Sequence, residues 1–230
     1  MMNQVLLPGF MQVQFVTPHD LGGWLQVNLD KTEMDYLWGR IKAAEERDEN
    51  IRSTLAGQLS ASLALDDKDD YFQNNILQPL AKEYLNQQPL IINYIRGNRM
   101  SSETQNDDTF NMLLDQWWVN KQKQGEFNPI HNHSGLFSFV VWMHEPVENA
   151  EQNKQENAKT SNRPCHHEFC FHYSTMTSHL THTAYPLGKE LEGTMLLFPS
   201  ELFHSVNPFF NNDGIRISIA GNIGVKGRWD

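Results

Sequence analysis

The sequence has few cysteines, no excess of positive charge and no long apolar run. Its 230 residues include only two cysteines, Cys165 and Cys170, so a fold held together by disulfide bonds is not predicted. It carries 18 lysine and arginine side chains against 28 aspartate and glutamate side chains, a formal net charge of −10 at pH 7. That balance disfavours nucleic acid as a partner, because binding its phosphate backbone needs a basic surface.

Membrane insertion and secretion are not predicted either. No stretch approaches the roughly 20 apolar residues of a membrane-spanning helix. The first ten residues, MMNQVLLPGF, lack a basic segment, and Pro8 interrupts their short apolar stretch, so they are not typical of a signal peptide. We expect a soluble cytoplasmic protein, in the host cytoplasm if the chain is viral. The sequence does not predict an oligomeric state.

The first 88 residues predict mainly helices. A short β-branched and apolar stretch, Phe10 to Phe15, favours a strand. A helix is expected from Lys31 to about Arg47, because Asp30 can cap it and Glu33 follows three residues later. Its apolar stripe at helical spacing consists of Met34, Leu37, Trp38 and Ile41.

A second helical stretch follows Asp70, and Pro79 must either kink it or begin a new helix. Its apolar face consists of Ile76, Leu77, Leu80, Tyr84 and Leu85. Between the two helical stretches, LAGQLSASL at 55–63 is compatible with an extended segment.

After residue 88, short apolar segments alternate with turn residues. These segments read LLDQWWVN, FSFVVWM, EFCFHY, GTMLLFP and RISIAGNIG. Such a series is typical of an all-β barrel or sandwich. We expect one domain over 1–230, mainly β, in which a helical support region (1–88) packs on one sheet of a β core (89–230). The polar segment 147–164 has no periodicity and predicts a mobile surface loop, placed as a flap near the mouth of the site.

The segment FNPIHNHSG places two histidines two residues apart. Residues i and i+2 of a strand point to the same side, so His131 and His133 can share one metal ion while Asn132 faces away. His204, in LLFPSELFHSVNPF, is the candidate third ligand on a neighbouring strand. Asn128, the second residue of FNPIHNHSG, can orient the histidines or cap a turn, and the turn is the preferred interpretation.

An arginine alternates with isoleucines in the last strand. Arg216, Ser218 and Ala220 lie on one face of RISIAGN, opposite Ile215, Ile217 and Ile219. A guanidinium inside a barrel needs an anion, because burying an unpaired charge is costly. A dicarboxylate co-substrate would supply one.

Four ordered segments carry a family resemblance: NPIHNHSG, FSFVVWMHEP, EGTMLLFPSELFHSVNPF and RISIAGN. Together they resemble the 2-oxoglutarate- and iron(II)-dependent dioxygenases, and more closely the prolyl 4-hydroxylase-like oxygenases of tailed phages and marine bacteria. The resemblance covers residues 115–223 best and implies a double-stranded β-helix, or jelly roll, with iron(II) at one mouth.

The resemblance also implies roles for residues. His131 and His204 match the two histidines of the family's iron site, and His133 stands where the family usually has aspartate or glutamate. Arg216, helped by Ser218, matches the pair that holds the far carboxylate of 2-oxoglutarate. The implied reaction uses dioxygen, converts 2-oxoglutarate to succinate and hydroxylates a substrate, for which a prolyl or other peptide side chain is the class considered.

Two other functions and a second metal site stay open at this point. The chain can be a non-catalytic jelly-roll module, for carbohydrate binding or in a virion, or a three-histidine dioxygenase of the cupin type that uses no 2-oxoglutarate. A cysteine- and histidine-rich stretch, Cys165 to His182, offers zinc ligands, but Cys165 and Cys170 have opposite strand parity. We expect its histidines to line the substrate mouth or the surface.

Overall fold

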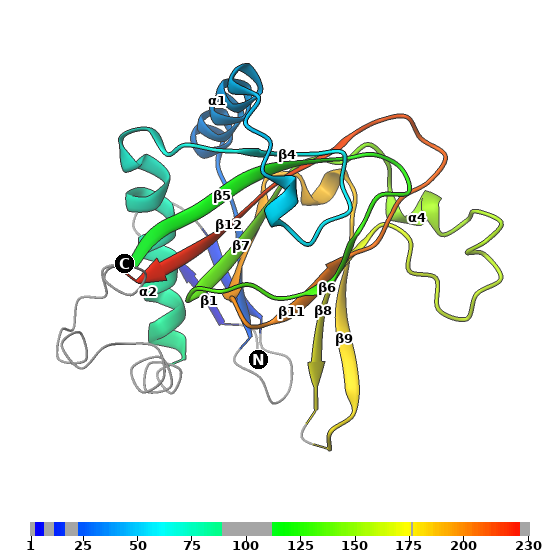
Figure 1. The fold of residues 1–230 in the computed structure, drawn as a ribbon. Helices are drawn as coiled ribbons and strands as arrows, with labels where there is room; N and C mark the ends of the chain where they lie inside the picture. Colours follow the sequence, from blue (N-terminus) through cyan, green and yellow to red (C-terminus); the bar gives the residue numbers. More distant parts are fainter. Residues whose placement is uncertain (1–2, 7–11, 17–22, 89–111, 176, 226–230) are drawn as a thin grey trace.

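The computed structural model describes residues 3–6, 12–16, 23–88, 112–175 and 177–225, and its fold is mainly β, as predicted (Figure 1). Every pair of neighbouring strands runs antiparallel. The major sheet has the order β1 (Asn3–Leu6), β2 (Gln12–Val16), β3 (Trp24–Asn28), β10 (Thr194–Pro199), β7 (Phe137–His144), β12 (Arg216–Val225), β5 (Met112–Gln122) and β4 (Ala61–Ala64). The minor sheet has the order β6 (Asn128–His131), β11 (Phe203–Val206), β8 (Glu168–Ser174) and β9 (Leu180–Pro186).

Eight strands from the second half of the chain form a double-stranded β-helix. Four of them, β10, β7, β12 and β5, lie together in the major sheet, and the other four make up the minor sheet. The first 88 residues are not only a helical support, because β1 to β3 extend the major sheet at one edge and β4 extends it at the other. Strand β2 was expected as part of the stretch Phe10 to Phe15, whose first two residues lie outside the described ranges, and β4 as part of the extended segment 55–63. Strands β1 and β3 are too short for alternation to predict them.

The helical elements come largely from the first 88 residues. They are α1 (Lys31–Arg47), the 3₁₀ turns η1 (Arg52–Thr54) and η2 (Lys68–Asp70), the π-helical turn η3 (Gln73–Leu77) and α2 (Gln78–Gln87). The second half adds only α4 (Asn149–Gln152) and η4 (Lys189–Leu191) among the described residues. None of the helices in the described ranges is long and apolar enough to cross a bilayer.

Helix α1 begins and ends where the sequence predicts. The Asp30 carboxylate accepts hydrogen bonds from the backbone N–H groups of Thr32 and Glu33, and the Glu33 carboxylate accepts one from the Asp30 N–H at 2.8 Å. Leu37 and Ile41 are buried as expected. The placement of Trp38 in the buried stripe was wrong, since its side chain is 39% exposed.

The second helical stretch changes type at its proline. A π-helical turn, Gln73–Leu77, runs into α2, where Pro79 lies in the first turn and its missing N–H is not needed. The predicted apolar face is buried throughout: Ile76, Leu77, Leu80, Tyr84 and Leu85.

The helices cover the outer face of the major sheet, as predicted (Figure 1). Side chains of α1 and α2 form one apolar cluster with the outward residues of the sheet, among them Val119, Val141 and Ile219. A second cluster lies between the two sheets and contains Trp24, Val140, Trp142, Phe169, Phe171, Leu187, Leu196 and Phe198. Both faces of the central strands are therefore buried, and Arg216, on the inner face of β12, is buried with them.

Candidate metal centre

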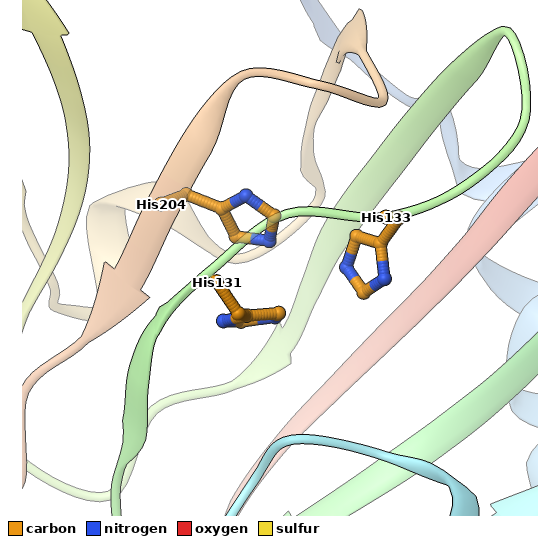
Figure 2. A group of neighbouring side chains, drawn as sticks. All are labelled: His131, His133 and His204. Carbon is orange, nitrogen blue, oxygen red and sulfur yellow. The ribbon is translucent and has the colours of Figure 1, made fainter.

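Three histidine side chains converge at one end of the space between the sheets (Figure 2). Each of His131, His133 and His204 offers a ring nitrogen, and these nitrogens lie within 4.8 Å of one another. His131 is the last residue of β6 and faces its Cα partner His204 in β11. The sequence predicted this convergence of residues 73 positions apart, and the register of β6 with β11 brings it about.

His133 reaches the group for a different reason from the one the sequence suggested. Strand β6 ends at His131, so His133 does not share a strand face with it. Instead the His133 backbone N–H donates to the Ser200 carbonyl at 2.8 Å. This bond anchors the segment after β6 beside the turn that precedes β11, and the His133 ring then lies 5.1 Å from the His204 ring, centroid to centroid.

Backbone carbonyls orient two of the imidazoles. Nδ1 of His131 lies 2.7 Å from the carbonyl oxygen of Pro129, and Nδ1 of His204 lies 2.9 Å from that of Leu202. A carbonyl only accepts, so both rings carry their proton on Nδ1 and keep the lone pair on Nε2. This is the usual arrangement of metal-binding histidines, whose second nitrogen is held by a hydrogen bond.

Burial favours the neutral form of all three rings. It lowers the pKa of His131, and it lowers the pKa of His133 to about 4, helped by the charge of His131. The pKa of His204, the most buried of the three, is well below its usual range, mainly through the loss of solvation. Neutral imidazole is the form that binds metal ions.

The donor set fits iron(II). Imidazole nitrogens suit zinc, copper, iron and nickel, and three ligands on one side leave positions for a small molecule and dioxygen. No other group of three or more metal-capable side chains occurs among the described residues. The group contains no carboxylate, as the sequence indicated.

A cavity opens beside the three imidazoles. Its apolar wall includes Trp118, Val140, Trp142, Phe169, Phe198 and Val206. Its polar side chains, apart from the histidines, are Asn120, Asn128 and Ser218. A site of this kind excludes most water and can position a small polar ligand through a few groups.

Asn120 was missed in the sequence, although it has the same parity as Trp118 on β5. Its amide oxygen accepts a hydrogen bond from the Ser62 hydroxyl at 2.7 Å, which leaves its NH₂ group to donate. Asn120 is the Cα partner of Ser218 on β12. The predicted co-substrate residue Ser218 therefore lies at the cavity with a donor beside it.

The segment Leu55 to Gly57 also lines the cavity, which the sequence did not indicate. Gly57 approaches Asn128 so closely that a Cβ on it would lie 2.4 Å from the Asn128 side-chain oxygen. Asn128 is the first residue of β6 rather than part of a turn, and its buried amide oxygen has no hydrogen-bond partner. An unpaired buried acceptor beside the imidazoles is available to a ligand.

Arg216 is buried between the sheets as predicted, and the chain itself supplies an anion beside it, Glu145, which the sequence did not indicate. Its Nε lies 3.2 Å from a carboxylate oxygen of Glu145, and Nη1 donates to the Gln122 side-chain oxygen at 3.0 Å. Nη2 donates to Nδ1 of His167, and the guanidinium lies 5.4 Å from the centre of the Phe209 ring. Arg216 is not among the residues that line the cavity; Ser218, two residues along the same face, is.

The cysteine- and histidine-rich stretch does not form a second metal group in the described part of the chain. Its members disperse: Cys165 is exposed, Cys170 is buried on β8, and both are free thiols. His172 on β8 and His182 on β9 lie near the surface, as expected. His167 was placed wrongly, since it is fully buried against Arg216.

The segment 147–164 contains a short helix as well as loop, and none of its residues lines the cavity. It begins with α4, and the buried Gln152 side chain bonds both the N–H and the carbonyl of Phe210, at 2.8 and 3.0 Å. After the buried Ala158, residues 159–165 are all exposed. Its role as a flap stays a prediction.

Limited trypsin digestion is expected to cut first after Lys159, at the start of this exposed run, because exposed loop tips are the preferred sites of nicking. The fragments are to be identified by mass spectrometry. Lys159→Gln should remove that first cut and leave later ones unchanged. Early cutting in α1 or β12, with the 159–165 run intact, would contradict the prediction.

Comparisons with known proteins point to one superfamily. Residues 116–222 match the family model described as "Putative 2OG-Fe(II) oxygenase". A non-heme α-ketoglutarate-dependent carbocyclase from nogalamycin biosynthesis has a similar structure, with a TM-score of 0.50 and 9% sequence identity over 88% of this chain and 79% of that one. At that identity the likeness bears on the fold, and it agrees with the double-stranded β-helix.

Two further structures are less similar. The viral collagen prolyl hydroxylase of Paramecium bursaria Chlorella virus-1 aligns with 87% of this chain and 94% of its own, with 14% identity and a TM-score of 0.45. An oxidoreductase of the 2OG-Fe(II) oxygenase family from Burkholderia pseudomallei aligns over 60% of this chain and 58% of its own, with 14% identity and a TM-score of 0.36. No curated protein matches the sequence, and no comparison supports a phage origin.

Proposed function

We propose that this chain, which belongs to the superfamily of 2-oxoglutarate- and iron(II)-dependent oxygenases, is a hydroxylase whose iron is held by His131, His133 and His204. The observation that carries the proposal is the approach of three ring nitrogens to within 4.8 Å of one another at the edge of a cavity. Iron(II), 2-oxoglutarate and dioxygen are the superfamily's cofactor and co-substrates.

Bound iron(II), with 2-oxoglutarate and dioxygen, supplies the oxidation of a substrate C–H bond to C–OH while 2-oxoglutarate becomes succinate and carbon dioxide. The chain supplies position and a dry environment. Carbonyls of Pro129 and Leu202 hold two imidazoles with Nε2 available, and the aromatic wall of the cavity keeps water away from the reacting atoms.

The co-substrate is proposed to extend from the imidazoles along the inner face of β12. Ser218 and the neighbouring Asn120 offer a hydroxyl and an NH₂ group at the cavity. Arg216, two residues further along the same face, is the cation that would hold the far carboxylate. Because Arg216 already contacts Glu145, the far carboxylate of 2-oxoglutarate must share that contact or replace it.

The substrate class proposed is a peptide side chain, with proline as the first to be tried, on the sequence resemblance to prolyl 4-hydroxylase-like oxygenases. The unpaired Asn128 oxygen at the cavity is the group proposed to orient such a substrate, as acceptor of a hydrogen bond from the backbone N–H of a residue that flanks the proline. The cytoplasmic location that the sequence favours stays a prediction.

Anaerobic titration of the iron(II)-loaded protein with 2-oxoglutarate is expected to produce the visible charge-transfer band of the chelate. Admission of air with a proline-rich peptide should then release succinate and add one oxygen atom to the peptide, measured by mass spectrometry. A peptide of the same length without proline is the control. Iron binding without the band would contradict a 2-oxoglutarate site and favour a three-histidine dioxygenase of another kind.

A further inference from the structure

The buried cluster around Arg216 contains a carboxylate that the proposed reaction does not use. Glu145 follows β7 directly, is fully buried and lies 71 positions from Arg216 in the chain. One of its oxygens, Oε2, lies 3.2 Å from Arg216 Nε and 3.2 Å from His167 Nε2. The other, Oε1, is buried and has no hydrogen-bond partner.

His167 completes the cluster as a neutral ring. Its Nδ1 accepts a hydrogen bond from Arg216 Nη2, so the proton lies on Nε2, which is 3.0 Å from the Val147 carbonyl oxygen. Burial and the arginine charge lower the pKa of His167 to about 3. The cluster therefore contains one cation, Arg216, and one group able to hold a negative charge, Glu145.

A dicarboxylate that reaches Arg216 would add a second negative charge to this pair. The pair is neutral without it, and an uncompensated charge inside the protein is costly. A proton on Glu145 restores neutrality and gives the carboxyl an O–H to donate. The unpaired Oε1 is free to take that proton.

Resting on the proposed function, we propose that Glu145 is a positioning residue for the co-substrate: it holds the Arg216 guanidinium in the free enzyme and takes up a proton from solvent when the far carboxylate of 2-oxoglutarate binds. The only covalent bond that forms is the O–H bond on Glu145, and the proton returns to solvent when the ligand leaves.

The electrostatic surroundings of Glu145 agree with this role. Burial raises its pKa to about 7, although the charge of Arg216 acts in the opposite direction. Glu192, whose carboxylate accepts from the Glu145 backbone N–H at 2.8 Å, and Glu148 raise it further. Arg216, His167, Glu148 and Glu192 are the titratable groups that face Glu145 from the surrounding elements in the described structure.

The sign of the pH dependence follows. A second carboxylate at Arg216 raises the pKa of Glu145 above its value of about 7 in the free protein. Below a pH of about 7, Glu145 of the free protein is already protonated, so 2-oxoglutarate binds without proton uptake. Above it, each binding event takes up a proton, and the affinity falls with rising pH by up to roughly tenfold per pH unit.

The test is calorimetric titration of the metal-loaded protein with 2-oxoglutarate in buffers of different ionisation enthalpy. At about pH 8.5, above the pKa of Glu145, close to one proton per ligand should be taken up, and at about pH 6 almost none. Glu145→Gln should abolish the uptake and bind 2-oxoglutarate at least as tightly as the wild type at the higher pH. Glu192→Gln, a neighbouring carboxylate outside the pair, is the matched control and should retain the uptake.

The outcomes separate this inference from the function on which it rests. No proton uptake by the wild-type protein, with 2-oxoglutarate still bound through Arg216, would overturn the role of Glu145 and leave the hydroxylase proposal intact. This measurement needs no variant, so it decides even if Glu145→Gln does not fold. If 2-oxoglutarate does not bind, or binds equally well when Arg216 is changed, the proposed anchor itself fails.

Discussion

Replacement of His204 or His131 by alanine is expected to weaken iron(II) binding by at least about 100-fold, more than the roughly 10–100-fold that loss of a ligand's hydrogen-bond partner costs. Each of the two imidazoles is held by a carbonyl at Nδ1, which leaves its Nε2 for the metal. Anaerobic equilibrium titration with iron(II) measures the change. His179→Ala, at an exposed histidine, is the matched control and should bind as the wild type does.

His133→Ala distinguishes a three-histidine site from a two-histidine site. If His133 is a ligand, its removal should weaken iron binding as strongly as the loss of His131, and His133→Asp should restore binding by supplying a carboxylate. Full iron binding by His133→Ala would mean that only two histidines hold the metal. A thermal unfolding curve for each variant shows that lost binding is not lost folding, because His204 is buried and its truncation leaves a cavity.

Arg216→Ala is expected to weaken 2-oxoglutarate binding by about 30-fold or more, since a charged, hydrogen-bonded contact in such a site is worth on the order of 2–5 kcal/mol. Iron(II) binding should change little, because the guanidinium is not a ligand. Titration calorimetry and the rate of succinate release measure the two effects separately. Arg163→Ala, at an exposed arginine, is the control.

The pairing of Arg216 complicates the alanine variant and calls for a second one. Removing the guanidinium leaves Glu145 buried beside His167 without its cation, which costs about 3–5 kcal/mol of stability when a buried pair is broken. Arg216→Lys keeps the charge but loses the fork that bonds Glu145, Gln122 and His167 together. A lysine variant that folds and still binds 2-oxoglutarate as tightly as the wild type would show that the positive charge at this position, and not the forked guanidinium, holds the co-substrate.

The sequence predicted the helices and strands of this protein well wherever the pattern that indicates them spans only a few neighbouring residues. The capping box at Asp30 and Glu33, the proline that begins α2 and the apolar runs of β5, β7, β8, β10 and β12 each follow from short-range backbone chemistry and periodicity. The sequence also predicted which histidines meet, because their order matches a family pattern. The short strands β1 and β3 were not predicted, since strands of four or five residues carry too little periodicity.

Only the tertiary structure decided what each polar side chain faces. The parity of strand β12 placed Arg216 between the sheets, but its partners Glu145 and His167 arrive from elements 71 and 49 positions away, and no local pattern links them. The His133 ring reaches the other two imidazoles because the His133 backbone N–H donates to the Ser200 carbonyl. The segment Leu55 to Gly57 lines the cavity because Gly57 has no side chain to hold the segment away from Asn128. These contacts depend on how the sheets and loops pack, so they exist in the folded chain and leave no periodic trace in the sequence.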